Sequence, residues 1–216
     1  MLVLYGHLFS SYTWKALIAL YANGTAFELR SVGEGHPEHD ALVAAASPQG
    51  KFPLLVDGAQ TVFEASSIIE YLQLYHPGPA PLLPADPAAA AQLRMIDRVF
   101  DNYVMGIMQE SVVEAIRSGG KPDPALLAAV AERLDQSYAW IDNWLASYPV
   151  TMDVTLIECA AAPSLFYTDW VHPIPDQFTR LRAWRAHLLA LPAVARCVED
   201  ARPYRHYFPL GAPDRD

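Results

Sequence analysis

The chain has 216 residues, and its 24 acidic residues outnumber its 15 lysines and arginines, which gives a formal charge of −9. This balance argues against a nucleic-acid-binding protein, because such proteins present a basic face, and two cysteines are too few for a disulfide framework. Although 52% of the residues are hydrophobic, no charge-free stretch reaches the ~18 residues of a membrane span. We therefore expect a cytoplasmic protein that binds neither membrane nor nucleic acid.

The first part of the chain alternates between strand and helix patterns. Asn23-Gly24 is typical of a helix end, and Asp57-Gly58 is a strong signal for a tight antiparallel hairpin. In chain order, the predicted elements are a strand at 2–5, a helix at 10–23, a strand at 27–32, a polar helical or irregular segment to 46, hairpin strands at 54–56 and 61–63, and a helix at 65–75. This order fits a small mixed sheet with helices, an α/β fold.

A proline-rich segment follows at 77–86 (PGPAPLLPAD). Proline can continue neither a helix nor a central strand, so this segment predicts a linker. We expect it to separate an α/β domain at 1–76 from an all-α domain at 87–216.

Three helix starts mark the second part of the sequence. Asp86-Pro87 and Asp123-Pro124 each combine an N-cap residue with proline at the first helical position. Thr155 and Glu158 have the spacing of a capping box. Helices are predicted at 87–117, at 124–145, from 156 onward, at 175–190 and at 193–202.

Motifs of several enzyme classes are missing from the chain. It contains no nucleophile elbow, phosphate-binding loop, dinucleotide fingerprint or zinc-protease motif. His36, His39 and Asp40 could ligate a metal, but they lie at a polar helix start, where a solvated surface is the commoner arrangement. We therefore expect no metal site.

Two regions remain as candidates for chemistry. Ser10-Ser11-Tyr12 follows the first strand at a helix start, where hydroxyl groups either cap the helix or serve a ligand. Pro53 opens a strand at a turn and is a candidate cis-proline. Residues 64–67 begin the next helix, whose free N–H groups attract an anion unless its serines only cap it. Together these regions indicate an extended, anionic small ligand at the strand ends.

Four segments resemble, in order, the motifs of the glutathione S-transferase family. LYGHLFSSYTWKALIAL is similar to the first strand, serine loop and helix of its serine-type classes, nearest the phi and zeta patterns. SPQGKFPLLVDG resembles the N-P-x-G-K-V-P segment, FEASSIIEYL the E-S-x-A-I-x-x-Y-L segment, and VTLIECAAAPSLFY the S/T-L-A-D-x-x-x-x-P-x-L signature. The resemblance spans nearly the whole chain. It implies a thioredoxin-like domain before the helical one, a homodimer, and an enzyme with glutathione as co-substrate.

The resemblance also implies which residue contacts the glutathione sulfur. Ser10 matches the serine whose hydroxyl donates a hydrogen bond to the sulfur, and its neighbour Ser11 is an alternative donor. Tyr12 is a rival because other classes of the family use tyrosine, but its offset from Ser10 makes it the second choice.

The remaining glutathione contacts follow from the same resemblance. They are Lys51 for the glycyl carboxylate, the main chain of Phe52 before Pro53 for the cysteinyl part, and Glu64 with the amides of Ala65 and Ser66 for the γ-glutamyl end. Ala65 stands where the motif has serine, which removes one hydroxyl contact unless Ser66 replaces it. This departure predicts weaker glutathione binding.

An electrophilic substrate needs an apolar wall near the sulfur. The candidates, each of which could instead serve the core or a subunit contact, are Leu8, Phe9, Tyr12, Tyr103, Met105 and Met108. Residues 207–209 (Tyr-Phe-Pro) could cover the same cleft or merely dock.

The function that this resemblance favours is conjugation of the glutathione thiolate to small hydrophobic electrophiles, a detoxification reaction. One alternative is a glutathione-dependent isomerase of the maleylacetoacetate type, in which glutathione adds to a double bond and leaves again. The other is a non-catalytic, transferase-like binding or regulatory protein, which the alanine at position 65 favours.

Overall fold

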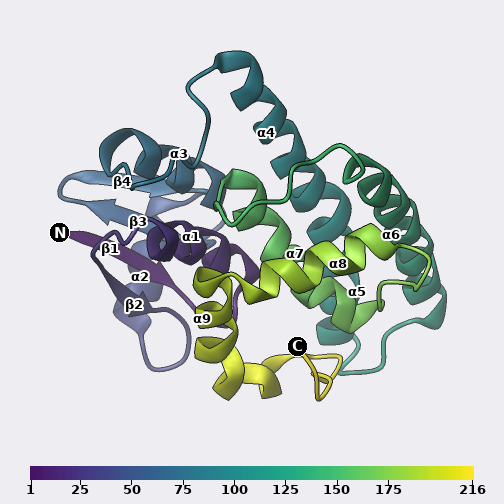
Figure 1. Cartoon of the computed structure of the whole chain (residues 1–216). Coiled ribbons are helices and arrows are strands. Elements are labelled where there is room, and N and C mark those ends of the chain that lie inside the picture. The colour runs from purple at the N-terminus through teal and green to yellow at the C-terminus, as the bar shows by residue number, and fades with distance from the viewer.

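The computed structural model describes residues 1–216 and begins with a four-stranded mixed sheet (Figure 1). Its elements are β1 (Leu2–Gly6), α1 (Ser11–Ala22), β2 (Phe27–Ser31), α2 (Pro37–Ala46), β3 (Leu54–Asp57), β4 (Gln60–Phe63) and α3 (Ala65–Tyr75). The strand order is β2-β1-β3-β4, with β1 parallel to β2 and antiparallel to β3. The predicted hairpin is confirmed, because Asp57 pairs with Gln60 across a two-residue turn.

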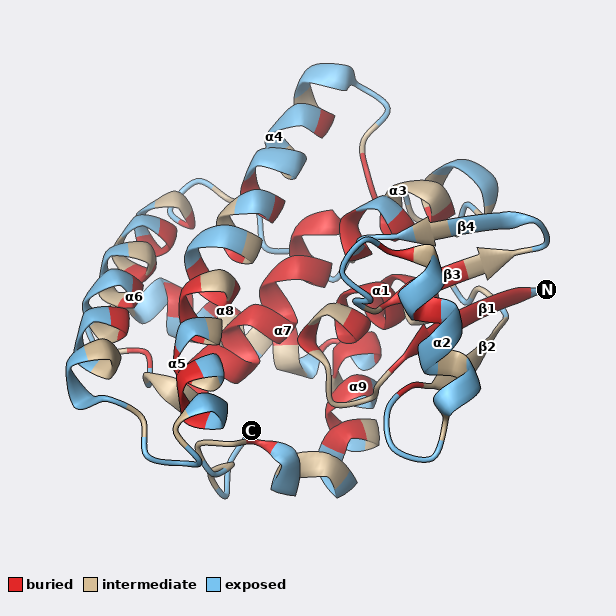
Figure 2. Ribbon diagram, turned by 180° about the vertical axis from the view of Figure 1, so that it is seen from behind, coloured by how far each residue is buried: buried red, intermediate tan, exposed pale blue.

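The two faces of the sheet carry different layers because side chains alternate along a strand. On β1, Leu2 and Leu4 join the main core with residues of α1 and α3. Val3 and Tyr5 point the other way and pack with Val43 of α2 in a small second cluster. Val43 is the only buried residue of α2, so this helix is the most exposed layer of the sheet (Figure 2).

The rest of the chain is helical, and the predicted fold class is confirmed. Its elements are α4 (Pro87–Val99), the π-helical turn η1 (Phe100–Met105), α5 (Gly106–Arg117), α6 (Pro124–Trp144), α7 (Leu156–Val171), α8 (Thr179–Ala190), α9 (Pro192–Ala201) and the 3₁₀ turn η2 (Arg202–Tyr207). The side chains of Asp86 and Asp123 cap α4 and α6 as predicted, and the capping box of Thr155 and Glu158 begins α7. No helix in this structure is both long and apolar enough to cross a bilayer.

Helix α7 is the centre of the molecule and is buried along almost its whole length (Figure 2). It packs against α1, α4 and η1. One cluster of 47 buried residues therefore runs from the sheet into the helical region. The segment at 77–86 contains no helix or strand, yet the two parts that it joins share this core.

Candidate active site

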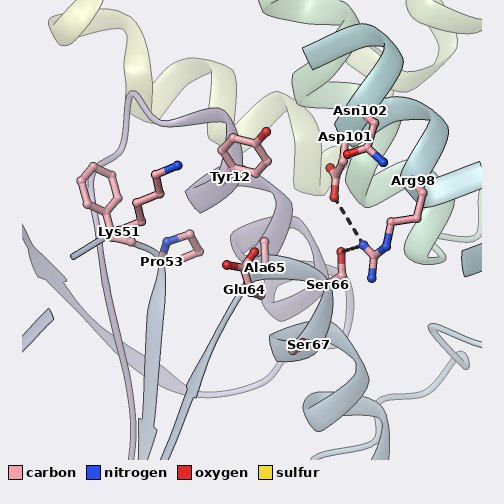
Figure 3. A pocket seen from close by; sticks show the side chains of 11 residues that line it. Tyr12, Lys51, Pro53, Glu64, Ala65, Ser66, Ser67, Arg98, Asp101 and Asn102 are labelled. Carbon is pink, nitrogen blue, oxygen red and sulfur yellow. Dashed lines mark hydrogen bonds and ion pairs between the residues drawn. The ribbon is translucent and has the colours of Figure 1, made fainter. Parts of the chain in front are cut away.

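A polar cavity of about 400 Å³ opens where β3 and α3 begin and where η1 passes above them. Its lining residues are Tyr12, Lys51, Phe52, Pro53, Glu64, Ala65, Ser66, Ser67, Arg98, Asp101 and Asn102. Figure 3 shows Lys51 and Arg98 on opposite sides, with Glu64 and Ala65 between them. The residues that the sequence assigns to the glycyl, cysteinyl-backbone and γ-glutamyl parts of glutathione, which are Lys51, Phe52, Pro53, Glu64, Ala65 and Ser66, thus all lie around one cavity.

The floor of this cavity is the start of α3. The peptide bond between Phe52 and Pro53 is cis, as the sequence led us to expect. Glu64, the N-cap residue, has φ 67° and ψ 119°, a left-handed conformation that costs a non-glycine residue about 1–3 kcal/mol. No side chain caps α3, so the serines do not serve as caps. The first N–H groups of the helix have no intrahelical acceptor, which is the usual basis of anion binding at a helix start.

Behind the floor lies a buried ion cluster that consists of Lys15, Ser66, Asp97, Arg98 and Asp101. Lys15 Nζ is 2.5 Å from Asp97 Oδ1, 2.7 Å from Asp101 Oδ2 and 2.9 Å from Ser66 Oγ. The Ser66 hydroxyl donates to Asp97 Oδ2 at 2.9 Å and accepts from Arg98 at 3.0 Å. Since the hydroxyl of Ser66 is occupied in this way, it does not replace the one that is missing at residue 65.

The cluster supplies charged groups that the sequence analysis missed. Arg98 and Asp101 of the cluster, together with the uncharged Asn102, line the side of the polar cavity that lies opposite Lys51 (Figure 3). Burial raises the pKa of Asp101, while the neighbouring Lys15 ammonium opposes that shift. No motif marks these residues, because they reach the cavity only through the packing of α4 and η1 against α7 and the ion pairs of Asp97 and Asp101 with Lys15 of α1.

An apolar cavity of about 260 Å³ adjoins the polar one, and Tyr12 lines both. Its other lining residues are Phe9, Ser10, Ser11, Met108, Gln109, Val112, Ile116, Tyr167, Tyr207, Phe208 and Pro209. Burial, with Asp101 and Glu64 nearby, raises the pKa of Tyr12 to about 12. Tyr12 therefore keeps its hydroxyl proton at neutral pH.

Ser10 lies at the N-terminus of α1, with its side chain on the apolar cavity. Its Oγ accepts a hydrogen bond from the backbone N–H of Thr13 at 3.3 Å. This capping bond uses a lone pair and leaves the hydroxyl proton free to be donated. Capping the helix and donating to a ligand are thus compatible roles for one serine.

His7 holds the loop that carries this serine. The backbone N–H of Phe9 donates to His7 Nδ1 at 3.1 Å, and the backbone N–H of His7 is 3.3 Å from Thr13 Oγ1. The imidazole also contacts the edge of the Tyr204 ring, at 4.8 Å between centroids. Burial lowers the pKa of His7, so the ring is neutral at pH 7 and its Nδ1 can accept.

Comparison with known proteins points to one family. Residues 4–80 match the glutathione S-transferase N-terminal domain. This part of the chain is therefore a glutathione S-transferase N-terminal domain, and the chain as a whole is similar to proteins of that family. A probable maleylacetoacetate isomerase of Caenorhabditis elegans is 27% identical over 203 residues, which are 93% of this chain and 94% of the relative.

Solved structures extend the similarity to the helical region. A glutathione S-transferase of Methylobacterium radiotolerans, in complex with glutathione sulfonate, is 27% identical with a TM-score of 0.74, over 91% of this chain and 94% of its own. Glutathione transferase F7 of Populus trichocarpa has a TM-score of 0.80 at 21% identity, over 93% and 99% of the two chains. The latter identity supports a shared fold only.

The apolar residues predicted for the substrate pocket separate into two groups in the structure. Phe9, Tyr12 and Met108 line the apolar cavity, as do residues 207–209. The other three predictions do not match the structure. Leu8 lines a different cavity beside β2 and α9, Met105 is buried in the core, and Tyr103 is exposed on the outer face of η1, where its carbonyl accepts from Ser137.

The predicted continuous helix from residue 87 to 117 is interrupted by the π-helical turn η1 between Phe100 and Met105. Tyr103 and Met105 lie within this turn, whereas Met108 follows it and lines the apolar cavity. Leu8 lies in the loop between β1 and α1, far from η1 in the chain. Tyr167 was also missed, although its hydroxyl donates to the Phe9 carbonyl at 2.9 Å and closes one wall.

Proposed function

We propose that this chain is a glutathione transferase that joins the thiol sulfur of glutathione to small apolar electrophiles. The observation that carries the proposal is the pair of adjoining cavities that share Tyr12. One is polar and bears charges of both signs, as a zwitterionic tripeptide requires. The other is apolar and contains the hydroxyl groups of Ser10 and Ser11 at a helix start.

The polar cavity offers a partner for each charged part of glutathione. The Lys51 ammonium fits the glycyl carboxylate, and the main chain of Phe52 before the cis peptide fits the cysteinyl backbone. The free amides of Ala65 and Ser66, with Arg98 nearby, fit the γ-glutamyl carboxylate. The carboxylates of Glu64 and Asp101 fit its ammonium group. These local groups matter because a chain of formal charge −9 does not attract an anion through its overall field.

Ser10 activates the thiol by donating a hydrogen bond. A free thiol has a pKa of about 8.5, so only a few per cent is thiolate at neutral pH. A hydrogen bond to a charged group contributes about 1.5–3 kcal/mol, which lowers the thiol pKa by roughly one to two units. The N-terminus of α1 acts in the same direction. The proton leaves to solvent, and the thiolate sulfur bonds to the electrophilic carbon in the apolar cavity. In a substitution the leaving group departs with its bonding electrons, and in an addition the π electrons of the activated double bond take up a proton from solvent.

A second candidate function is isomerisation. It is favoured by the similarity, over 93% of the chain, to a relative named a probable maleylacetoacetate isomerase. The thiolate would add to an activated double bond, the intermediate would rotate about the resulting single bond, and the thiolate would leave. Mass spectrometry of the products distinguishes the two reactions, because only conjugation leaves glutathione attached.

We further propose that the transferase acts as a cytoplasmic homodimer in detoxification. Support for a subunit contact comes from exposed apolar side chains on β4, α3, α4, η1 and α6, which are Phe63, Leu74, Tyr75, Met95, Tyr103 and Trp140. Three of them, Met95, Tyr103 and Trp140, line one open groove of about 710 Å³. Analytical ultracentrifugation tests this, with Trp140→Glu expected to shift the chain toward monomer.

Calorimetry with glutathione is the test of the proposal as a whole. Binding with a dissociation constant below the millimolar range, and weaker binding in Lys51→Ala, support it. A chain that binds no glutathione at millimolar concentration would be a transferase-like protein with another role.

A further inference from the structure

We propose that His36, Glu38 and His39 form a binding site for a divalent transition metal such as Zn²⁺, separate from the polar cavity, whose lining includes none of the three. The sequence alone favours a solvated surface at these residues. In the structure, however, each of the three offers a ligand atom, and these atoms all lie within 4.8 Å of one another. The site is on the first turn of α2 and its N-cap residue.

The orientation of His39 is the observation that carries the proposal furthest. Its Nδ1 is 2.7 Å from the carbonyl oxygen of Ser31. Because a carbonyl only accepts, Nδ1 must carry the proton, and the lone pair of the imidazole is therefore on Nε2. Nε2 lies on the side of Glu38, 3.8 Å from its Oε1. A histidine whose second nitrogen donates to a carbonyl is the usual arrangement of a metal ligand.

Packing holds the rings before any metal binds. The ring of Tyr5 contacts the His39 ring edge-on, with 5.3 Å between centroids and an interplanar angle of 76°. His36 and His39 stack at 5.3 Å with an angle of only 9°. Both imidazoles are partly buried, whereas Glu38 is exposed and free to move toward an ion. Little rotational freedom of the two rings is left to be lost on binding.

The donor set determines the class of metal. Two imidazole nitrogens and one carboxylate, with a fourth place left to water, suit Zn²⁺, Ni²⁺ or Cu²⁺ better than Mg²⁺, which prefers oxygen ligands. With bonds of about 2.0–2.1 Å around a tetrahedral ion, donor atoms stand roughly 3.3 Å apart. The donor atoms now lie within 4.8 Å of one another, so Glu38 and the His36 ring must move closer together to hold a tetrahedral ion. The two acidic residues in the first turn, Glu38 and Asp40, offset the positive end of the α2 dipole.

Metal binding would stabilise α2, the least buried of the helices that pack on the sheet. Only Val43 of α2 is buried, and His39 ties the helix to the last residue of β2 through Ser31. An ion held by residues on both sides of the helix start would link the preceding loop to the first turn. The melting temperature should therefore rise when Zn²⁺ is added.

Titration calorimetry of the full chain with ZnCl₂ tests the proposal. One Zn²⁺ per chain is expected, with affinity at least tenfold weaker in His39→Gln and His36→Gln, and weaker to a smaller extent in Glu38→Gln. Glu38 is exposed, so the last variant keeps its fold. The matched control is His76→Gln, because His76 lies 2.7 Å from Asp57 but has no second imidazole beside it; its affinity should be unchanged.

Three results would overturn the proposal. They are the absence of stoichiometric Zn²⁺ binding, equal affinity in His39→Gln and the unchanged chain, and loss of binding in His76→Gln alone. Binding of MgCl₂ in place of ZnCl₂ would contradict the assigned donor set. None of these outcomes depends on whether the chain binds glutathione.

Discussion

Replacing Lys15 by methionine should be one of the most destabilising single changes in this protein. Lys15 is 1% exposed and Asp97 is fully buried, so the substitution removes the buried cation beside the Asp97 carboxylate and leaves it only the half-exposed Arg98 as a charged partner. Removing one partner of a buried ion pair costs about 3–5 kcal/mol. At about 2–4 °C per kcal/mol for a chain of this size, the melting temperature should fall by roughly 6–20 °C. The missing ammonium should also raise the pKa of Asp101 further, since burial already raises it and Lys15 opposes that shift.

Thermal and urea unfolding of Lys15→Met measure this loss, and two further variants separate its cause. Arg94→Met removes the cation of the exposed pair with Glu70, whose side chains are 44% and 33% exposed, and should cost no more than about 1 kcal/mol. The double variant Lys15→Met with Asp97→Asn should regain part of the stability, because one buried charge is removed with its partner. A loss below about 1 kcal/mol in Lys15→Met would refute the view that this cluster is a stabilising, buried network.

Three other predictions concern the cavities. Ala65→Ser should tighten glutathione binding about 2- to 10-fold in calorimetry, because it adds one hydrogen bond worth about 0.5–1.5 kcal/mol at the start of α3; weaker binding would show that the cavity has no room for the hydroxyl. Lys51→Ala should weaken glutathione binding by roughly 10- to 100-fold, since a charge-assisted bond of about 1.5–3 kcal/mol is lost, and unchanged affinity would place the glycyl end elsewhere. His7→Gln should flatten the decline of stability at acidic pH. Burial holds the pKa of His7 in the folded protein below its ordinary value of 6.5. The neutral ring therefore contributes fully to the free energy of unfolding above pH 6.5, and this contribution is lost as the pH falls through the folded-state pKa. Protonation of the ring also breaks the hydrogen bond from the backbone N–H of Phe9. Urea unfolding of both proteins between pH 5 and 8 measures the difference, and parallel pH profiles would contradict this role.

Local chemistry explains which parts of the fold could be predicted from the sequence. The caps at Asp86, Asp123 and Thr155 depend on residues within three positions, and all are present. The same holds for the hairpin at Asp57 and for the cis peptide before Pro53. These features are set by a few neighbouring residues, so a short pattern is enough to recognise them.

Long-range packing explains what could not be predicted. Arg98 and Asp101 reach the polar cavity because Lys15 and Ser66 hold them against α1 and α3, and these partners are more than 30 residues away. The π-helical turn η1 has no sequence signal, and Tyr103, which lies in this turn, is exposed instead of lining the apolar cavity. The segments proposed to bind glutathione are short motifs, whereas the groups opposite them are assembled only by the tertiary structure.

Exchange of the serine at the start of α1 separates its two roles. Ser10→Ala removes both the hydrogen-bond donor and the N-cap, and the lost cap costs about 0.5–2 kcal/mol of stability. Ser10→Gly removes the same donor but loses only a few tenths of a kcal/mol as a cap. A defect that both variants share is therefore due to the missing hydroxyl and not to a weakened helix.

The pKa of glutathione bound to the protein is the measurement that tests the central claim most directly. Thiolate absorbance, titrated with pH on the saturated protein, should give a thiol pKa about one to two units below the free value of about 8.5. In Ser10→Ala and Ser10→Gly the pKa should return toward the free value, while the glutathione dissociation constant stays close to that of the unchanged chain. A depressed pKa that persists in both variants, or that is lost in Ser11→Ala instead, would contradict the role assigned to Ser10.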